Sequence, residues 1–213
     1  MYVPDHFRED RIPVLQETMR QIGFGALVTL GADGIVASHI PMLIEAEPSP
    51  WGRLSGHLAR SNPQWQSARA DIEALAIFSG PQGYITPSWY PTKQATGKVV
   101  PTWNYLAIHA YGRLRFIDDL DHTRAHITRL TAMHEGKRAV PWRVSDAPAA
   151  YIEAMIKGII GFELLLTRIE GKWKMSQNRP AEDRAGVVAG LSEEGADALA
   201  ALIAERAARD GNS

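Results

Sequence analysis

The sequence predicts a mostly β protein with peripheral helices, in which the strands form an antiparallel barrel. Three observations predict this class. About seven segments have the Val, Ile and Leu content or the alternation of strands, GADG at 31–34 separates two of them as in a hairpin, and helical spacing is concentrated at the ends and in one insertion. No low-complexity linker or internal repeat divides the chain. We therefore expect a single domain over residues 1–213, with a helical insertion at about 119–158 and a C-terminal helix at about 192–208.

The first half of the chain is expected to begin with a helix and to continue with strands. Apolar residues recur at near-helical spacing over 8–22, and Gly23 follows as a stop. Strands are predicted at 26–30, 35–44, 53–58, 74–78 and 84–86, and Pro41 favours an edge or bulged strand. Asn62 and Pro63 resemble a helix cap followed by proline, which predicts a helix to about Ala70. The segment GPQG at 80–83 is expected to end the strand that precedes it.

The second half contains the longest predicted strand, over 102–117. Alternation places the even-numbered residues 104–116 on its drier face, which we expect to point into the core. Asp118 or Asp119 can cap a helix whose apolar stripe comprises Leu120, Ile127, Leu130 and Met133. A helix at about 148–157 then leads into a strand at 159–169, and Gly171 is expected to turn the chain back into 173–175. The last helix is predicted from Ser192, with an apolar stripe of Leu199, Leu202 and Ile203.

The bulk composition limits the class of protein. The formal net charge is −1 and the pI is about 6.7, so the chain lacks the basic excess typical of proteins that grip DNA through its backbone. There are no cysteines, which excludes disulfides, thiol nucleophiles and thiolate metal sites. The first residues do not resemble a signal peptide, and no apolar run approaches the roughly 20 residues of a membrane-spanning helix. We expect a soluble, cytoplasmic protein.

Three segments could carry chemistry. In the first, at 55–65, a strand ends in Arg60 and Ser61 before a predicted helix start, an arrangement suited to a phosphate; a capped helix with a solvated arginine is the competing interpretation. The second, 78–105, gathers Trp, Tyr, Lys and hydroxyl residues in a loop-rich stretch, as expected for a site that stacks a flat heterocycle, or for a cover over the barrel mouth. The third, 171–180, ends a strand in amides and cations, and could equally be a solvated turn.

Two other patterns are weaker. His122 and His126 are four residues apart on a predicted helix, but no third ligand is evident, so we expect a solvated helix face and no metal.

The C-terminal segment resembles a helix-turn-helix, but its second helix would begin with Ser192, Glu193 and Glu194. Carboxylates at the end that should face phosphates argue against DNA docking, and they are instead expected to stabilise a helix N-terminus.

The chain as a whole resembles the PaiB-type FMN-binding negative transcriptional regulator family. The resemblance is carried by MYVPDHF at 1–7, GHLARSNPQW at 56–65, YITPSWY at 84–90, VPTWNY at 100–105 with His109, and GKWKMSQNR at 171–179. These motifs come in the family's order and cover nearly the whole chain. Each is weak alone, whereas the set is specific.

The resemblance implies a split antiparallel barrel of the pyridoxamine-phosphate-oxidase-like type, a homodimer, and FMN bound at the subunit interface. Carried onto this sequence, it implies that the phosphate is held by Arg60, Ser61 and Asn62. The ring and ribityl region would be lined by Trp89, Tyr90, Lys93, Trp103 and Asn104, with Lys174, Gln177 and Asn178 reaching across from the partner. His57 and His109 belong to the same motifs and complete the candidate cofactor-binding set.

The resemblance favours a flavin-binding regulator that responds to FMN occupancy or redox state. The alternatives are a flavin-dependent oxidoreductase, using reduced nicotinamide or another small substrate with an indirect regulatory effect, and a flavin carrier. No residue stands out as a catalytic acid or base. The composition and the acidic helix start make direct DNA binding doubtful.

Overall fold

The computed structural model describes residues 1–32 and 34–210, so Asp33 of the predicted hairpin lies outside the described residues. The chain divides into two units. Unit 1 comprises Met1–Asp10, Ser79–Ile108 and Glu170–Ser213, and unit 2 comprises Arg11–Phe78 and His109–Ile169.

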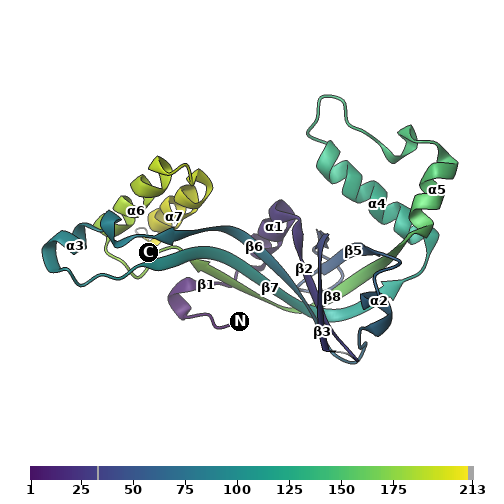
Figure 1. Cartoon of the computed structure of the whole chain (residues 1–213), viewed down its shortest axis with the longest axis horizontal. Coiled ribbons are helices and arrows are strands. Elements are labelled where there is room, and N and C mark those ends of the chain that lie inside the picture. The colour runs from purple at the N-terminus through teal and green to yellow at the C-terminus, as the bar shows by residue number, and fades with distance from the viewer. Residues whose placement is uncertain (33, 211–213) are drawn as a thin grey trace. The chain divides into compact units, whose positions relative to one another are not determined.

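The strands form one sheet with the order β3-β2-β6-β7-β8-β5-β4, and β1 pairs with β8 (Figure 1). The β1–β8, β2–β3, β2–β6, β4–β5 and β5–β8 pairs are antiparallel. The strands are β1 (Arg8–Glu9), β2 (Phe24–Gly31), β3 (Gly34–Pro41), β4 (Leu43–Glu45), β5 (Arg53–Ala59), β6 (Ala74–Ile85), β7 (Thr102–Ile117) and β8 (Ile159–Lys174). The predicted strand at 102–117 is confirmed with both bounds, and Pro41 is the last residue of an edge strand, as its missing N–H requires.

The core of unit 2 consists of apolar side chains from one face of its strands and from helix α1 (Ile12–Ile22). Leu15, Leu27, Leu54, Phe78 and Phe162 are among its fully buried members. Gly56 of β5 lies directly under one of them: an added Cβ would come within 2.5 Å of the Phe162 ring, so only glycine fits there.

Two predicted strand breaks are wrong. β6 continues through Gly80, Pro81 and Gly83, and β8 continues through Gly171. β2 pairs with β6 only at residues 75–77, so the later part of β6 lacks this neighbour and can accommodate a proline. Gly171 lies opposite Glu9 of β1, so the neighbouring strand holds it in an extended ladder rather than in a turn.

The helices also differ from the prediction at several boundaries. α1 begins at Ile12, because residues 8–9 form β1, and it ends as expected at Gly23, which has a φ of 63°. α2 spans only Gln64–Ser67 instead of reaching Ala70. The insertion contains α4 (Leu120–Glu135), capped by Asp119, and α5 (Ala149–Lys157), as expected. The short η1 (Asp5–Phe7), η2 (Pro87–Trp89) and η3 (Val144–Asp146) and helix α3 (Pro91–Thr96) complete the elements before the C-terminal helices.

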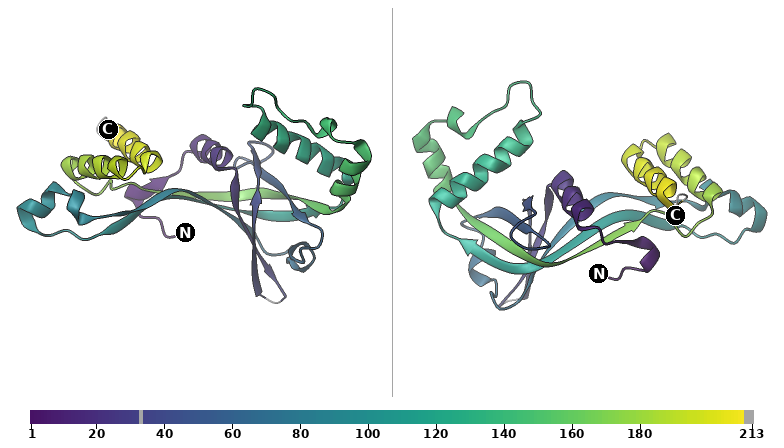
Figure 2. Two further views of the ribbon diagram at one scale, coloured as in Figure 1. Left: turned by 45° about the horizontal axis from the view of Figure 1, so that its top comes forward. Right: turned by 180° about the vertical axis from the view of Figure 1, so that it is seen from behind.

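Unit 1 ends in two helices, α6 (Ala181–Glu193) and α7 (Asp197–Asp210), which lie side by side (Figure 2). The helix predicted from Ser192 therefore begins five residues later. Glu193 is the last residue of α6 and Glu194 its C-cap, so the expectation that these carboxylates stabilise a helix N-terminus is wrong. The predicted stripe of α7 is largely confirmed, since Leu199 and Ile203 are buried.

Within the described residues, none of the helices has the length and apolar character needed to span a membrane.

Candidate functional site

An open hollow lies in unit 2 where the end of β3 approaches β5. It has a volume of about 460 Å³ and is lined by Ser38, His39, Ile40, Pro41, His57, Leu58, Ala59, Asn62 and Ile159. We call this space the β3–β5 hollow. Its wall combines imidazole, hydroxyl and amide groups with aliphatic side chains, and its volume lies in the range of small-molecule sites. It contains two residues of the predicted set, His57 and Asn62.

The three residues that were predicted to hold the phosphate have different surroundings. Both Arg60 Nη atoms donate to the Asp118 carboxylate, at 2.9 and 2.6 Å, and Nε donates to the Lys157 carbonyl at 2.9 Å. Because of the Arg60 hydrogen bonds, the pKa of Asp118 is lowered. Binding a phosphate with Arg60 would therefore require exchange of this carboxylate. Ser61 is exposed beside it.

Asn62 is held by both ends of its amide. Its Oδ1 accepts from the backbone N–H of Gln64 at 3.0 Å, and its Nδ2 donates to Ser38 Oγ at 2.9 Å. The N-cap of α2 is nevertheless Pro63 and not Asn62 as predicted, and the helix has only four residues. So short a helix has a weak dipole, and the phosphate interpretation loses that part of its support.

His57 lies against a second histidine that the sequence assigned to solvent. His57 Nδ1 and His126 Nε2 are 3.3 Å apart, and His126 is only 1% exposed. Burial lowers the pKa of both imidazoles, that of His126 to about 4, so both are neutral near pH 7. The expectation of a solvated His122–His126 face is wrong for His126, which pairs with β5. No group of three metal-binding side chains occurs in the part of the chain that the structure describes.

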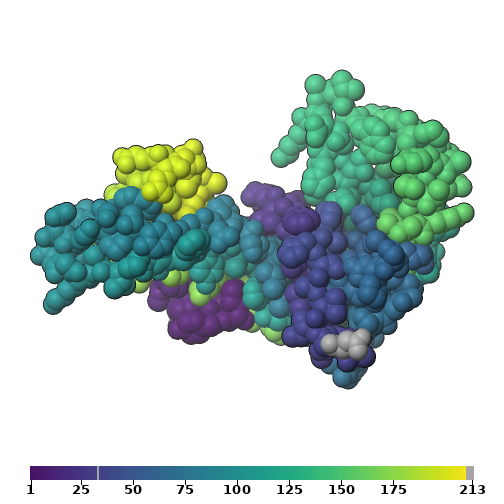
Figure 3. Space-filling view, in the orientation of Figure 1, coloured from purple at the N-terminus to yellow at the C-terminus, as the bar shows by residue number. Residues whose placement is uncertain are grey.

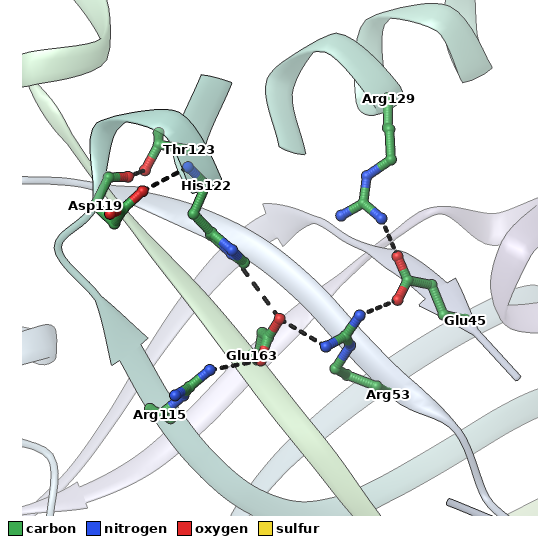
Figure 4. A network of polar contacts seen from close by, with 8 residues as sticks. All are labelled: Glu45, Arg53, Arg115, Asp119, His122, Thr123, Arg129 and Glu163. Carbon is green, nitrogen blue, oxygen red and sulfur yellow. Dashed lines mark hydrogen bonds and ion pairs between the residues drawn. The ribbon is translucent and has the colours of Figure 1, made fainter. Parts of the chain in front are cut away.

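A charged network that includes His122 and Arg129 of α4 fixes this helix on the sheet (Figure 4). Glu163 of β8 accepts from Arg53 at 2.8 Å and from Arg115 at 3.1 Å, and His122 lies 4.0 Å away. Glu45 pairs with both Arg53 and Arg129 of α4. The pKa of Glu45 is lowered by these two arginines, against the opposing effect of its partial burial. The network holds the helix that carries His126.

The predicted ring-lining residues belong to unit 1, where two of them have structural contacts. Trp89 packs against α6: a Cβ at Gly190 would lie 2.3 Å from its indole, and one at Gly186 would lie 2.0 Å from its carbonyl oxygen. Tyr90 is 1% exposed with Arg179 4.8 Å from its ring centre, and burial raises its pKa. Lys93 is exposed.

The remaining predicted residues of unit 1 meet where β7 begins and β8 ends. Asn104 is fully buried and donates to Ser176 Oγ at 2.8 Å, while its Oδ1 has no partner among the described residues. Ser176 has a φ of 61°, an uncommon conformation for a serine. Lys174 donates to Thr102 Oγ1 at 2.6 Å, and burial lowers its pKa.

Four further candidates have simpler surroundings. Trp103 is 48% exposed and donates to Gln82. Gln177 bonds the backbone that precedes Ser176: its Oε1 accepts from the Met175 N–H and its Nε2 donates to the Trp173 carbonyl. Asn178 is exposed. His109 belongs to unit 2, where its Nδ1 lies 3.5 Å from the Tyr111 hydroxyl.

Sequence reasoning missed the β3 wall of the hollow, namely Ser38, His39 and Pro41. The signal was present but faint: a serine, a histidine and a proline interrupt the otherwise apolar run at 35–44. Only the approach of β3 to β5 gives them a common role.

The antiparallel sheet with its flanking helices defines the fold class, a split barrel. The structure titled "FAD and Heme binding protein from Mycobacterium smegmatis" shares the fold, with a TM-score of 0.58 over 84% of this chain and 78% of that chain. At 14% identity the likeness concerns the fold. The predicted fold class is confirmed.

Sequence comparison then gives the family. The family described as "Putative FMN-binding domain" matches residues 1–168, and this chain belongs to it. The "Protease synthase and sporulation protein PAI 2" of Bacillus subtilis is 30% identical, over 91% of this chain and 90% of its own length. An uncharacterized protein of Emericella nidulans is 38% identical over 97% of each chain. The chain is therefore a PaiB-type member of the family, and FMN, the expected cofactor, is confirmed as the cofactor of the family.

Proposed function

We propose that the chain is a flavin-responsive regulatory protein that binds FMN in the β3–β5 hollow, at the interface of a homodimer. The main support for this proposal is the β3–β5 hollow. Its volume suits part of a flavin nucleotide, and it offers His39, His57 and Ser38 as polar groups together with aliphatic surface for a ring. The flavin would supply one- and two-electron chemistry, while the imidazoles would hydrogen-bond and orient it.

The hollow is open, so one chain covers only part of a bound ligand. Beside it, one face of the β3-β2-β6 part of the sheet is apolar and accessible: neighbouring positions on it are Ala37, Val28 and Leu75, with Ile35 78% exposed. Contiguous apolar surface of this kind marks an interaction site. A second copy is the occupant we infer, because an isologous contact through this face would also cover the hollow of each chain.

The regulatory role would not depend on direct DNA binding. α7, the supposed recognition helix, has Asp197 in its first turn, where a cation or a free amide would be needed beside a phosphate. A response of the dimer or of a protein partner to FMN occupancy or redox state is the simpler mechanism. The oxidoreductase alternative requires turnover, which aerobic NADH or NADPH oxidation by the loaded protein would reveal.

The test combines light scattering after gel filtration with flavin absorbance near ~450 nm. We expect the wild type to be a dimer that retains FMN. Ala37→Arg places a charge on the apolar face and should give a monomer with FMN affinity reduced at least about 10-fold, whereas Val140→Arg, at an 86% exposed position away from this face, should change neither. A dimeric, FMN-loaded Ala37→Arg variant would contradict the interface, and a wild type that binds no FMN would contradict the cofactor role.

A further inference from the structure

We propose that the helical insertion contains a second ligand site, which binds a small amphipathic organic anion such as an aryl or alkyl carboxylate. The site is an open hollow of about 600 Å³ between α4, the segment 142–147 and α5, and we call it the α4–α5 hollow. In the space-filling view these green residues form a lobe of their own (Figure 3). The volume is typical of small-molecule sites, and nothing in the proposed FMN function uses this hollow.

The lining is mainly apolar. Trp142, Val144 and Ile152 contribute the large apolar side chains, and Ala132, Ala147 and Ala149 contribute small ones. Trp142 is 45% exposed, so its indole presents a flat surface to whatever enters. A ligand with an aromatic ring or a short alkyl chain would bury this surface, which is the main source of affinity for such a pocket.

All the charged side chains that line the hollow are positive. Arg124 and Arg143 line it, and none of its lining residues is an Asp or Glu. Within the part of the chain that the structure describes, Arg143 has no ion pair, and Arg124 has a long one with Glu153, at 4.0 Å. By contrast, Arg138 in the same connecting segment is neutralised by Glu135 at 2.9 Å. The two arginines beside an apolar wall therefore match a carboxylate on an apolar body.

The geometry favours a small molecule over a protein segment. Three elements bound the space, and Ser145 adds a hydroxyl group that can donate to a second carboxylate oxygen. One wall is also fixed, because α4 is attached to the sheet through Arg129 and Glu45. A preformed wall lowers the entropic cost of binding.

Isothermal titration calorimetry of the full chain with 4-phenylbutyrate tests the proposal, with 4-phenylbutanol as the uncharged analogue. We expect the wild type to bind the carboxylate at least about 10-fold more tightly than the alcohol. Arg143→Gln should remove most of this difference, because a charge-assisted hydrogen bond is worth about 10-fold or more in affinity. Arg138→Gln should leave it unchanged, since that arginine does not line the hollow.

A second variant tests the location. Ala149→Trp places a large side chain at an exposed position of the lining and should abolish binding of both compounds, while circular dichroism reports an intact fold. The proposal is overturned if the wild type binds neither compound at millimolar concentration, or if Arg143→Gln and Arg138→Gln weaken the carboxylate equally. Retention of FMN by these variants separates this outcome from failure of the flavin site.

Discussion

The buried histidine pair predicts a specific dependence of stability on pH. In the folded chain, burial is the main cause that lowers the pKa of His126 from 6.5 to about 4; His57, Arg129 and His122 lower it further, and Glu45 acts in the opposite direction. The unfolded chain therefore takes up a proton at this residue below about pH 6.5, while the folded chain takes it up only near pH 4. Stability is complete above pH 6.5 and is lost as the pH falls through this window.

The magnitude follows from the displacement of the pKa. At about 1.36 kcal/mol per pKa unit, the change from 6.5 to about 4 corresponds to about 3 kcal/mol of unfolding free energy, lost between these two pH values. The group is almost fully buried, so solvent screening removes little of this amount. His126→Leu removes the titrating group while keeping a side chain of similar bulk, and should lose about 3 kcal/mol less than the wild type over the same range.

Urea unfolding followed by circular dichroism between pH 7 and pH 4, at one protein concentration and one FMN loading, measures this difference. His134→Leu, an exposed position at the end of the same helix, is the matched control and should follow the wild type. Parallel pH profiles for the wild type and His126→Leu would refute the reasoning, and so would equal flattening of the profile by His134→Leu.

Three further predictions concern other contacts. Arg60→Ala should weaken FMN binding at least about 10-fold in a fluorescence titration, whereas Asp118→Asn, which releases the guanidinium, should not weaken it; equal losses would mean that the ion pair is only structural. Gly190→Ala, which ordinarily stabilises a helix, should instead cost about 1–3 kcal/mol in urea unfolding because the new methyl group meets Trp89, and Trp89→Ala should rescue it; a stabilised single variant would contradict this packing. Glu163→Gln leaves two arginines without their shared carboxylate and should cost about 2 kcal/mol by the same measurement, and a change below about 0.5 kcal/mol would show that the network contributes little.

Strand content could be predicted from sequence because alternation is a local property. The period of two over 102–117 identified both faces of β7, and the buried even-numbered residues 104–112 follow it. The ends of the strands were predicted less well, because Gly and Pro end a strand only when no neighbouring strand holds them in an extended conformation. Residues 80–83 and Gly171 remain extended through the context of the sheet, which no local pattern contains.

The site depends even more on distant partners. Arg60 and Asp118 are 58 residues apart, so the motif around Arg60 could indicate a cation at the end of β5 but not the carboxylate that it contacts. Similarly, the residues of β3 that line the hollow acquire a role only through β5, with which β3 forms no ladder.

The helix α4 shows why a polar residue can be assigned to the wrong environment. The expected stripe began at Leu120, yet Leu120 is 45% exposed, and the buried positions are Thr123, His126 and Leu130. An apolar stripe identifies the buried face only if the surface beneath the helix is apolar. Here the strands beneath α4 present His57 and the Glu163 network, so the helix buries the groups that can hydrogen-bond them. The inner face of α4 thus carries the polar residues Thr123 and His126 beside Leu130, and this arrangement places His126 against His57 in the wall of the proposed flavin site.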